Sequence, residues 1–154
     1  MLETSTMQNS GISPKRLPIG YWLKRTDTLL TEGINAIQAE FGIDRSQWQL
    51  MNTIAETLFI EKKALIEVMK PFLNEAQIGT ELDKLVEMGI VSGPERLCLT
   101  EKGQQLHAVC LYKQKEFREK AMLGISKEEY EQTLSTLEKI VKNLDLNGAS
   151  PRSQ

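Results

Sequence analysis

The sequence predicts a mostly α-helical fold with one small β-hairpin. Apolar residues recur at helical spacing along most of the chain. Capping-box patterns and well-placed glycines mark where the helices begin and end. One Gly-Pro turn separates two short apolar runs within residues 90–99, as in a hairpin. These three observations favour a helical domain that carries a small strand element.

Composition narrows the class of protein. The chain has 154 residues, of which 40% are hydrophobic and 6% aromatic, as expected for one helical domain with a core. No apolar run approaches the ~18 residues of a membrane span, and the N-terminus lacks the apolar segment of a secretory signal. Cys98 and Cys110 match no zinc spacing, and one histidine cannot complete a site. We therefore expect a cytoplasmic protein with reduced core cysteines, no metal, no cofactor and no membrane partner.

A long first helix is expected at about residues 19–41. Pro18 suits its first turn, and apolar residues follow at steps of three and four up to Phe41. Gly42 is placed to end the helix. Such an amphipathic helix needs a partner to bury its apolar stripe, either from the same chain or from a second copy.

Two further helices form a helix-turn-helix pattern, preceded by a helix that Asp44 opens. Asp44 and Gln47 match a capping box, and residues 57–60 form a connector to a helix over 61–72, which Pro71 should end. A second capping box, Asn74 with Gln77, opens a helix over 74–89 that ends at Gly89. The expected inward residues are Leu65, Ile66, Val68 and Met69 in the first helix of the pair, and Ile78, Leu82, Leu85 and Val86 in the second.

The outer face of helix 74–89 is small and polar near its N-terminus. This face carries Ala76, Gln77, Thr80, Asp83 and Lys84. A helix with a strong inner face and such an outer face, placed after a tight turn, is typical of a DNA-recognition helix. The alternative is an ordinary surface helix.

The rest of the chain predicts a hairpin and two helices. The hairpin spans residues 90–99, with its turn at 92–96, and Thr100 caps a helix that runs to about Met122. Gly124 breaks that helix, and Ser126 with Glu129 opens the last one through a third capping box. The last helix carries a seam for another helix, made of Tyr130, Leu134, Leu137, Val141 and Leu144. We expect flexible tails at 1–17 and 146–154.

Four segments in this order resemble one known family. They are residues 19–25 (IGYWLKR), 41–50 (FGIDRSQWQL), 82–91 (LDKLVEMGIV) and 97–103 (LCLTEKG). Over residues 18–145 the chain resembles the MarR family of bacterial transcription regulators. The resemblance implies one domain. A winged helix-turn-helix at about 44–100 would lie between dimerisation helices at about 18–42 and 101–145.

The resemblance also implies a function. It is that of a homodimeric regulator that binds a palindromic operator in double-stranded DNA and is controlled by a small-molecule effector. The implied DNA-binding residues lie at the start of the supporting helix, along the recognition helix and in the wing. They are Arg45, Ser46 and Gln47, then Ala76, Gln77, Gly79, Thr80 and Lys84, and finally Arg96. Gln77 could pair with adenine through two hydrogen bonds, or it could only complete its cap. The alternative for residues 45–47 is a solvated helix start.

Two departures from the family pattern support a second hypothesis. The wing loop is only residues 92–96, and the recognition helix lacks an arginine near its start. Residues 61–96 also carry five basic and seven acidic side chains, a net charge of −2. The second hypothesis is therefore a winged-helix interaction module that binds a protein partner or a ligand, with weak or no DNA binding.

The remaining side chains that could carry chemistry suggest no enzyme. His107 has no serine, cysteine or aspartate at a catalytic spacing, so we expect it at the surface or in an interface. There is no glycine-rich phosphate loop. The effector crevice implied by the resemblance would lie where the first and last helices meet the winged domain. Trp22, Trp48, Met51 and Tyr112 could line it, but we expect each to be ordinary core.

Overall fold

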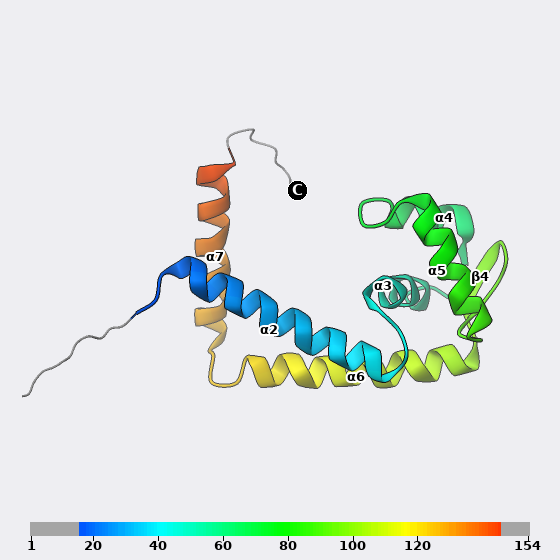
Figure 1. Cartoon of the computed structure of the whole chain (residues 1–154), viewed down its shortest axis with the longest axis horizontal. Coiled ribbons are helices and arrows are strands. Elements are labelled where there is room, and N and C mark those ends of the chain that lie inside the picture. Colours follow the sequence, from blue (N-terminus) through cyan, green and yellow to red (C-terminus); the bar gives the residue numbers. More distant parts are fainter. Residues whose placement is uncertain (1–15, 146–154) are drawn as a thin grey trace, which may run out of the picture. The chain divides into compact units, whose positions relative to one another are not determined.

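The computed structural model describes residues 16–145, and Figure 1 shows their helices and short strands. The predicted class, mostly α with a small β wing, is confirmed. Apart from residues 16 and 17, the tails predicted at 1–17 and 146–154 lie outside the described residues. The helices are α2 (Ile19–Glu40), α3 (Arg45–Ala55), α4 (Lys62–Met69), α5 (Glu75–Glu87), α6 (Glu101–Ala121) and α7 (Lys127–Leu144). The strands are β2 (Ile60–Glu61), β3 (Val91–Ser92) and β4 (Arg96–Leu99).

The chain forms two compact units. The first ends at Phe117 and the second begins at Arg118, so the boundary falls within α6. The first unit holds α2 to β4 and most of α6, and the second holds α7. None of the described helices is long and apolar enough to cross a membrane.

All three predicted capping boxes are confirmed with both of their hydrogen bonds. In the box that opens α5, the Gln77 amide donates to Asn74 Oδ1 at 2.8 Å, and the Asn74 amide donates to Gln77 Oε1 at 3.0 Å. The boxes that open α3 and α7 have the same form. Gly42, Gly89 and Gly124 all have positive φ, as expected of glycines that end helices.

The sheet has three antiparallel strands in the order β2-β4-β3. The hairpin of β3 and β4 was predicted, but β2 was not, and our assignment of residue 60 to a connector and residue 61 to a helix was wrong. β2 is only two residues long, and it is a strand because Ile60 pairs with Leu97 and Glu61 with Arg96. A two-residue run has no recognisable alternation, so tertiary pairing alone defines this strand.

The core of the first unit lies between α3, α4, α5 and the sheet. Leu50, Met51 and Ile54 of α3 have no exposed surface, and α2, α4, α5 and β4 all pack against this helix. Most of the predicted inward residues are buried, but Val68 and Val86 are more than 40% exposed, and for these two the prediction was wrong. Each lies at the edge of its helix's apolar stripe, and the packing within the described residues leaves much of its surface exposed. The other core residues are Ile43, Trp48, Leu65, Met69, Ile78, Leu82, Leu85, Ile90, Val91, Leu97, Leu99 and Cys110.

Thr100 joins the end of the hairpin to α6. Its hydroxyl accepts from the Gly103 amide at 3.0 Å, which confirms the predicted cap, and it donates to the Gly89 carbonyl at 2.6 Å. The Thr100 amide donates to the Ile90 carbonyl at 2.9 Å. Gly103 is buried against that same carbonyl, and a Cβ at this position would overlap its oxygen. The first turn of α6 is therefore packed directly on backbone.

The long helices leave apolar side chains exposed. α2 contacts α6 where Gly33 faces the Phe117 ring, and Lys113 pairs with Glu40 at 2.9 Å. Towards its N-terminus, however, α2 exposes Tyr21, Trp22 and Leu23 among other large apolar residues. In α7, described by itself, no residue is buried, and the predicted seam is exposed at Tyr130, Leu134, Val141 and Leu144. Of the two cysteines expected in the core, Cys110 is buried and Cys98 is half-buried.

Alanine substitutions at two helical glycines should change the free energy of unfolding in opposite directions. Gly103→Ala should lower the free energy of unfolding by about 1–3 kcal/mol, because its Cβ must displace the Ile90 carbonyl. Gly79→Ala is the matched control, since no atom lies within 4 Å of its Cβ position. It should raise the free energy of unfolding by up to about 1 kcal/mol through helix propensity. Urea titration measures both, and equal effects of one sign would contradict this account of α6.

Candidate nucleic-acid interface

α5 presents a small, polar surface at its N-terminus. A short turn after Met69 joins it to α4, with the Phe72 and Leu73 amides donating to the Met69 carbonyl. Ile78, Leu82 and Leu85 anchor the inner face in the core. On the outer face Ala76, Gln77, Thr80 and Lys84 are exposed as predicted, and Gly79 is half-buried. The structure thus brings the predicted recognition residues together on one face of a helix whose start is fixed by its cap.

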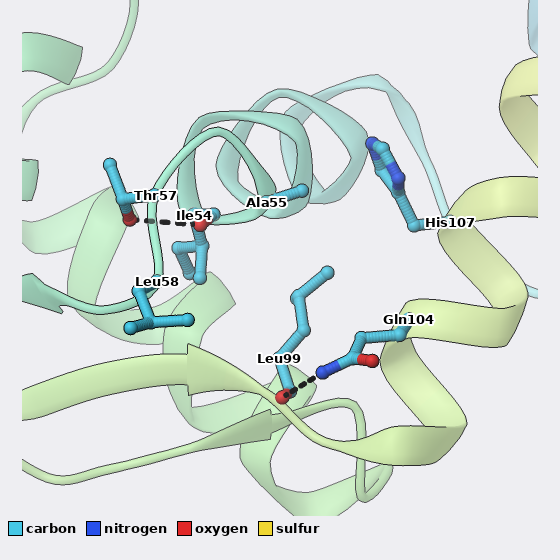
Figure 2. Close-up of a pocket in the computed structure, with 7 residues that line it drawn as sticks. All are labelled: Ile54, Ala55, Thr57, Leu58, Leu99, Gln104 and His107. Atoms are coloured by element: carbon cyan, nitrogen blue, oxygen red, sulfur yellow. Dashed lines mark hydrogen bonds between the residues drawn. The ribbon is translucent and has the colours of Figure 1, made fainter.

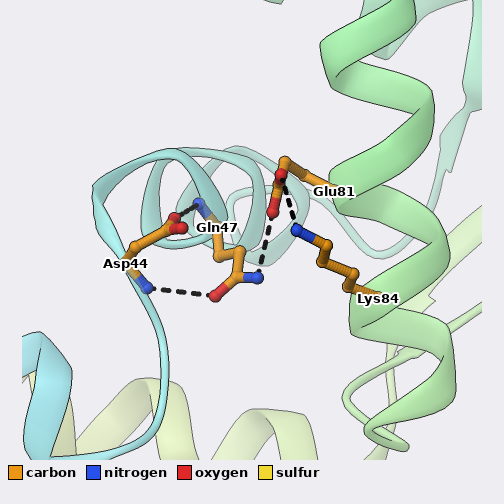
Figure 3. A network of polar contacts seen from close by, with 4 residues as sticks. All are labelled: Asp44, Gln47, Glu81 and Lys84. Atoms are coloured by element: carbon orange, nitrogen blue, oxygen red, sulfur yellow. Dashed lines mark hydrogen bonds and ion pairs between the residues drawn. The ribbon is translucent and has the colours of Figure 1, made fainter.

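A polar network joins the start of α3 to the middle of α5 (Figure 3). The Gln47 side chain is buried, with 7% of the residue exposed. Its Oε1 accepts from the Asp44 amide at 3.0 Å, and its Nε2 donates to Glu81 Oε1 at 3.0 Å. The other oxygen of Glu81 pairs with Lys84 Nζ at 3.2 Å. Both ends of the Gln47 amide are therefore engaged within the protein, while Arg45 is exposed and Ser46 half-buried beside it.

Helix α5 carries a net negative charge. Lys84 is its one basic residue, against Glu75, Glu81, Asp83 and Glu87. The Lys84 side chain is 53% exposed, so its ion pair with Glu81 is screened by water and holds it weakly. Lys84 can exchange this carboxylate for another anion, but the helix as a whole carries a net negative charge.

Arg96 lies at the first residue of β4 and is turned towards β2. Its guanidinium lies 3.7 Å from the centroid of the Phe59 ring, and its Nε lies 3.6 Å from Glu61 Oε1. The cation–π contact and the ion pair orient the side chain along its own sheet, but the pair is solvent-exposed on both sides and therefore weak. To reach a DNA groove, Arg96 would have to leave both partners.

His107 connects α6 to α3. Its ring stacks on Trp48 with centroids 4.9 Å apart, and its Nε2 lies 2.9 Å from Asn52 Oδ1. Because an amide oxygen accepts, the ring donates through Nε2. Burial lowers the pKa of His107, and the nearby Glu56 carboxylate partly offsets this effect. The half-buried histidine is therefore a structural bridge that is most stable in its neutral form.

A cavity of about 210 Å³ lies beside this bridge (Figure 2). It is bounded by the end of α3, the loop before β2, the end of β4 and the first turns of α6. The wall is mixed, because aliphatic side chains share it with a hydroxyl, an amide and an imidazole. The lining residues are Ile54, Ala55, Thr57, Leu58, Leu99, Gln104 and His107.

None of the four aromatic and methionine residues considered for an effector crevice lines this cavity. Trp48 and Met51 are core, as expected. Trp22 and Tyr112 are 52% and 61% exposed, so the expectation that they are core was wrong. Trp22 lies on α2 and Tyr112 on α6, and both are at the surface of these long helices. Within residues 16–145 there is no group of three or more His, Cys, Asp or Glu side chains that could hold a metal ion.

Comparison with known proteins identifies the fold. No family model and no curated protein matches the chain. Solved structures do match over most of its length. A transcriptional regulator of the MarR family from Clostridium acetobutylicum is 22% identical, with a TM-score of 0.66, over 81% of this chain and 97% of that one. The chain has the MarR-family fold.

Two other solved structures with the MarR-family fold contain bound molecules. A MarR-family protein of Mycobacterium tuberculosis in complex with DNA is 18% identical, with a TM-score of 0.63, over 81% of this chain and 98% of that one. CouR from Rhodococcus jostii, bound to p-coumaroyl-CoA, is 20% identical, with a TM-score of 0.62, over 80% and 91% of the two chains. The fold of this chain is thus shared with one protein in complex with DNA and another bound to an acyl-CoA.

The His107 bridge should make stability depend on pH. The folded state holds the His107 proton more weakly than the unfolded state, whose pKa is near 6.5. The stability contribution is therefore fully present above pH 6.5 and is lost as pH falls from there through the folded-state pKa. The chain has one histidine, so few other groups titrate in this window. Urea unfolding should show lower stability at pH 5.5 than at 7.5, with a smaller difference for His107→Gln. Equal pH slopes would contradict the assignment.

Proposed function

We propose that this chain is a homodimeric, DNA-binding transcription regulator of MarR type that acts in the bacterial cytoplasm. One observation carries the proposal. The N-terminal face of α5 exposes small and polar side chains at the point where a helix-turn-helix presents them to a major groove. In this proposal residues 18–145 act as one functional domain, with the winged helix-turn-helix at about 44–100.

The proposed contacts divide into base-reading and phosphate-binding groups. Ala76, Gln77 and Thr80 face the bases, and Gly79 allows close approach of the backbone. Lys84 binds phosphate from the other end of the exposed face. Arg45 and Ser46 do so from the start of α3. Gln47 acts through Glu81, by fixing how α3 and α5 meet. Arg96 contributes only if it leaves Phe59 and Glu61.

A second candidate function is a winged-helix module that binds a protein partner or ligand. The specific observation in its favour is electrostatic. α5 has four acidic residues against Lys84, and the wing arginine lies against Phe59 and Glu61 of its own chain. Non-specific DNA affinity comes mainly from neutralised phosphates, and this surface offers few cations for that purpose.

Selection from a pool of random duplex DNA, at low and moderate salt, separates the two candidates. A regulator should enrich a palindrome with half-sites about one helical turn apart. Lys84→Ala should weaken binding to the selected duplex and to unrelated duplexes by the same factor. It should also reduce the magnitude of the slope of log K against log salt by about one. Absence of enrichment, or unselective binding that salt removes, would favour the interaction module and contradict the regulator.

The dimer is proposed from the exposed apolar seams of α2 and α7. Val141→Asp should weaken self-association at least tenfold, because a buried valine contributes roughly 1.5–3 kcal/mol and a charge would replace it. Asn143→Asp adds the same charge on the same helix off the seam and should leave association unchanged. Analytical ultracentrifugation measures both. A wild-type chain that is monomeric at micromolar concentration would exclude a dimeric regulator.

We further propose that the cavity beside His107 takes the small-molecule effector. Its wall suits a compact, mainly apolar molecule with one or two polar groups, which Thr57, Gln104 and His107 could bind. The cavity touches both the end of β4 and the start of α6. A molecule bound there would alter the junction that joins the hairpin to α6.

A further inference from the structure

A capping box determines which end of a glutamine side chain faces outwards. The N-cap residue offers a backbone N–H, so the side-chain atom that meets it must be the oxygen. The amide nitrogen then lies on the other branch of the side chain and keeps two hydrogens to donate. This chain contains the arrangement twice, at Gln47 with Asp44 and at Gln77 with Asn74.

The two outward-facing nitrogens have different surroundings. Gln47 Nε2 donates to Glu81 Oε1 at 3.0 Å, in a buried contact between α3 and α5. Gln77 is exposed, and its Nε2 has no hydrogen-bond partner among residues 16–145. In the first box the fold itself supplies the acceptor that this geometry requires. In the second, none of residues 16–145 supplies it, so the exposed nitrogen is left to water or to a bound molecule.

We propose that Gln77 reads guanine in the operator, as a donor held by its cap, and does not pair with adenine through two hydrogen bonds. This inference rests on the proposed DNA-binding function. Pairing with adenine requires the glutamine oxygen to accept from adenine N6, but that oxygen faces the Asn74 backbone. Guanine presents two adjacent acceptors, N7 and O6, in the major groove. The outward-facing Gln77 Nε2, with its two N–H bonds, is complementary to these two acceptors.

The neighbouring side chains do not compete for the same base edge. Ala76 has no polar side-chain atom, and its methyl group suits a thymine methyl. Thr80 lies one turn further along the exposed face and can meet a thymine methyl or a phosphate. On the first turn of α5 Gln77 can therefore donate to a base edge, whereas the exposed Glu75 carboxylate can only accept.

The first test compares the duplexes selected by the full-length wild-type chain and by Gln77→Ala. The position read by Gln77 is the one whose preference disappears in the variant. We expect guanine there in each half-site, preferred over adenine by about 5- to 150-fold. Adenine at that position would overturn the inference and leave the regulator intact. Failure of the wild-type chain to select any duplex would instead overturn the proposed function, and this inference with it.

The second test replaces the outward-facing hydrogen-bond donor of Gln77 with an acceptor. Gln77→Glu keeps an acceptor for the Asn74 amide, so the cap and the helix start should survive, and it turns an oxygen outwards. The preferred base at the same position should change from guanine to cytosine, whose N4 donates. Asn74→Ser retains both halves of the box and should keep guanine. A Gln77→Glu chain that still selects guanine would overturn the inference.

A modified base tests whether Gln77 donates to guanine N7. Replacing the guanine of the selected duplex by 7-deazaguanine removes the N7 acceptor alone. The wild-type chain should lose binding by about 2- to 12-fold, taken as half of a bidentate contribution. Gln77→Ala should bind the two duplexes equally. Equal binding by the wild-type chain would show that Gln77 does not donate to N7, and would contradict the proposal.

Discussion

The winged-helix unit depends on the burial of one face of α3. Leu50, Met51 and Ile54 are fully buried there, and each contributes roughly 1.5–3 kcal/mol relative to an exposed side chain. α2, α4, α5 and β4 all pack against this helix. Its position therefore determines where α5 lies and which of its faces is left exposed. The polar network from Gln47 through Glu81 to Lys84 adds a directional contact to this packing, since a hydrogen bond constrains both the distance and the angle between its donor and acceptor.

The candidate interface combines geometry suited to DNA with weak electrostatics. The exposed face of α5 is anchored and capped, but the helix is acidic and Arg96 is held against Phe59 and Glu61. Affinity for any duplex would then depend less on phosphate neutralisation and more on contacts to bases. A protein of this kind would bind few sequences, and would bind them only when the base edges match its donors and methyl groups. The same acidity is the observation that keeps the interaction module as the second candidate.

The comparison of sequence with structure shows where local signals suffice. The three capping boxes and the helix-ending glycines were predicted correctly, because each depends on hydrogen bonds or φ angles within a few residues. β2 was missed because its pairing with β4 is a long-range contact. The Arg96 contacts with Phe59 and Glu61 could not be seen for the same reason. The acidic residue Glu61 at the sheet edge was visible in the sequence, but its strand partner was not.

The sequence by itself determined the helices, the capped and glycine-terminated ends, the hairpin and the polar outer face of α5, since all of these follow from periodicity and local hydrogen bonding. The ends of α4, predicted at 61 and 72, were not determined in this way and lie at Lys62 and Met69. Only the tertiary structure decided which of the side chains singled out in the sequence remain free to bind another molecule. It buried Gln47 and engaged both ends of its amide, it turned Arg96 towards β2, and it placed His107 on Trp48 beside a cavity. These outcomes depend on residues distant in the chain that meet only after packing. Periodicity carries no information about such meetings, because it records which face is buried and not what that face touches.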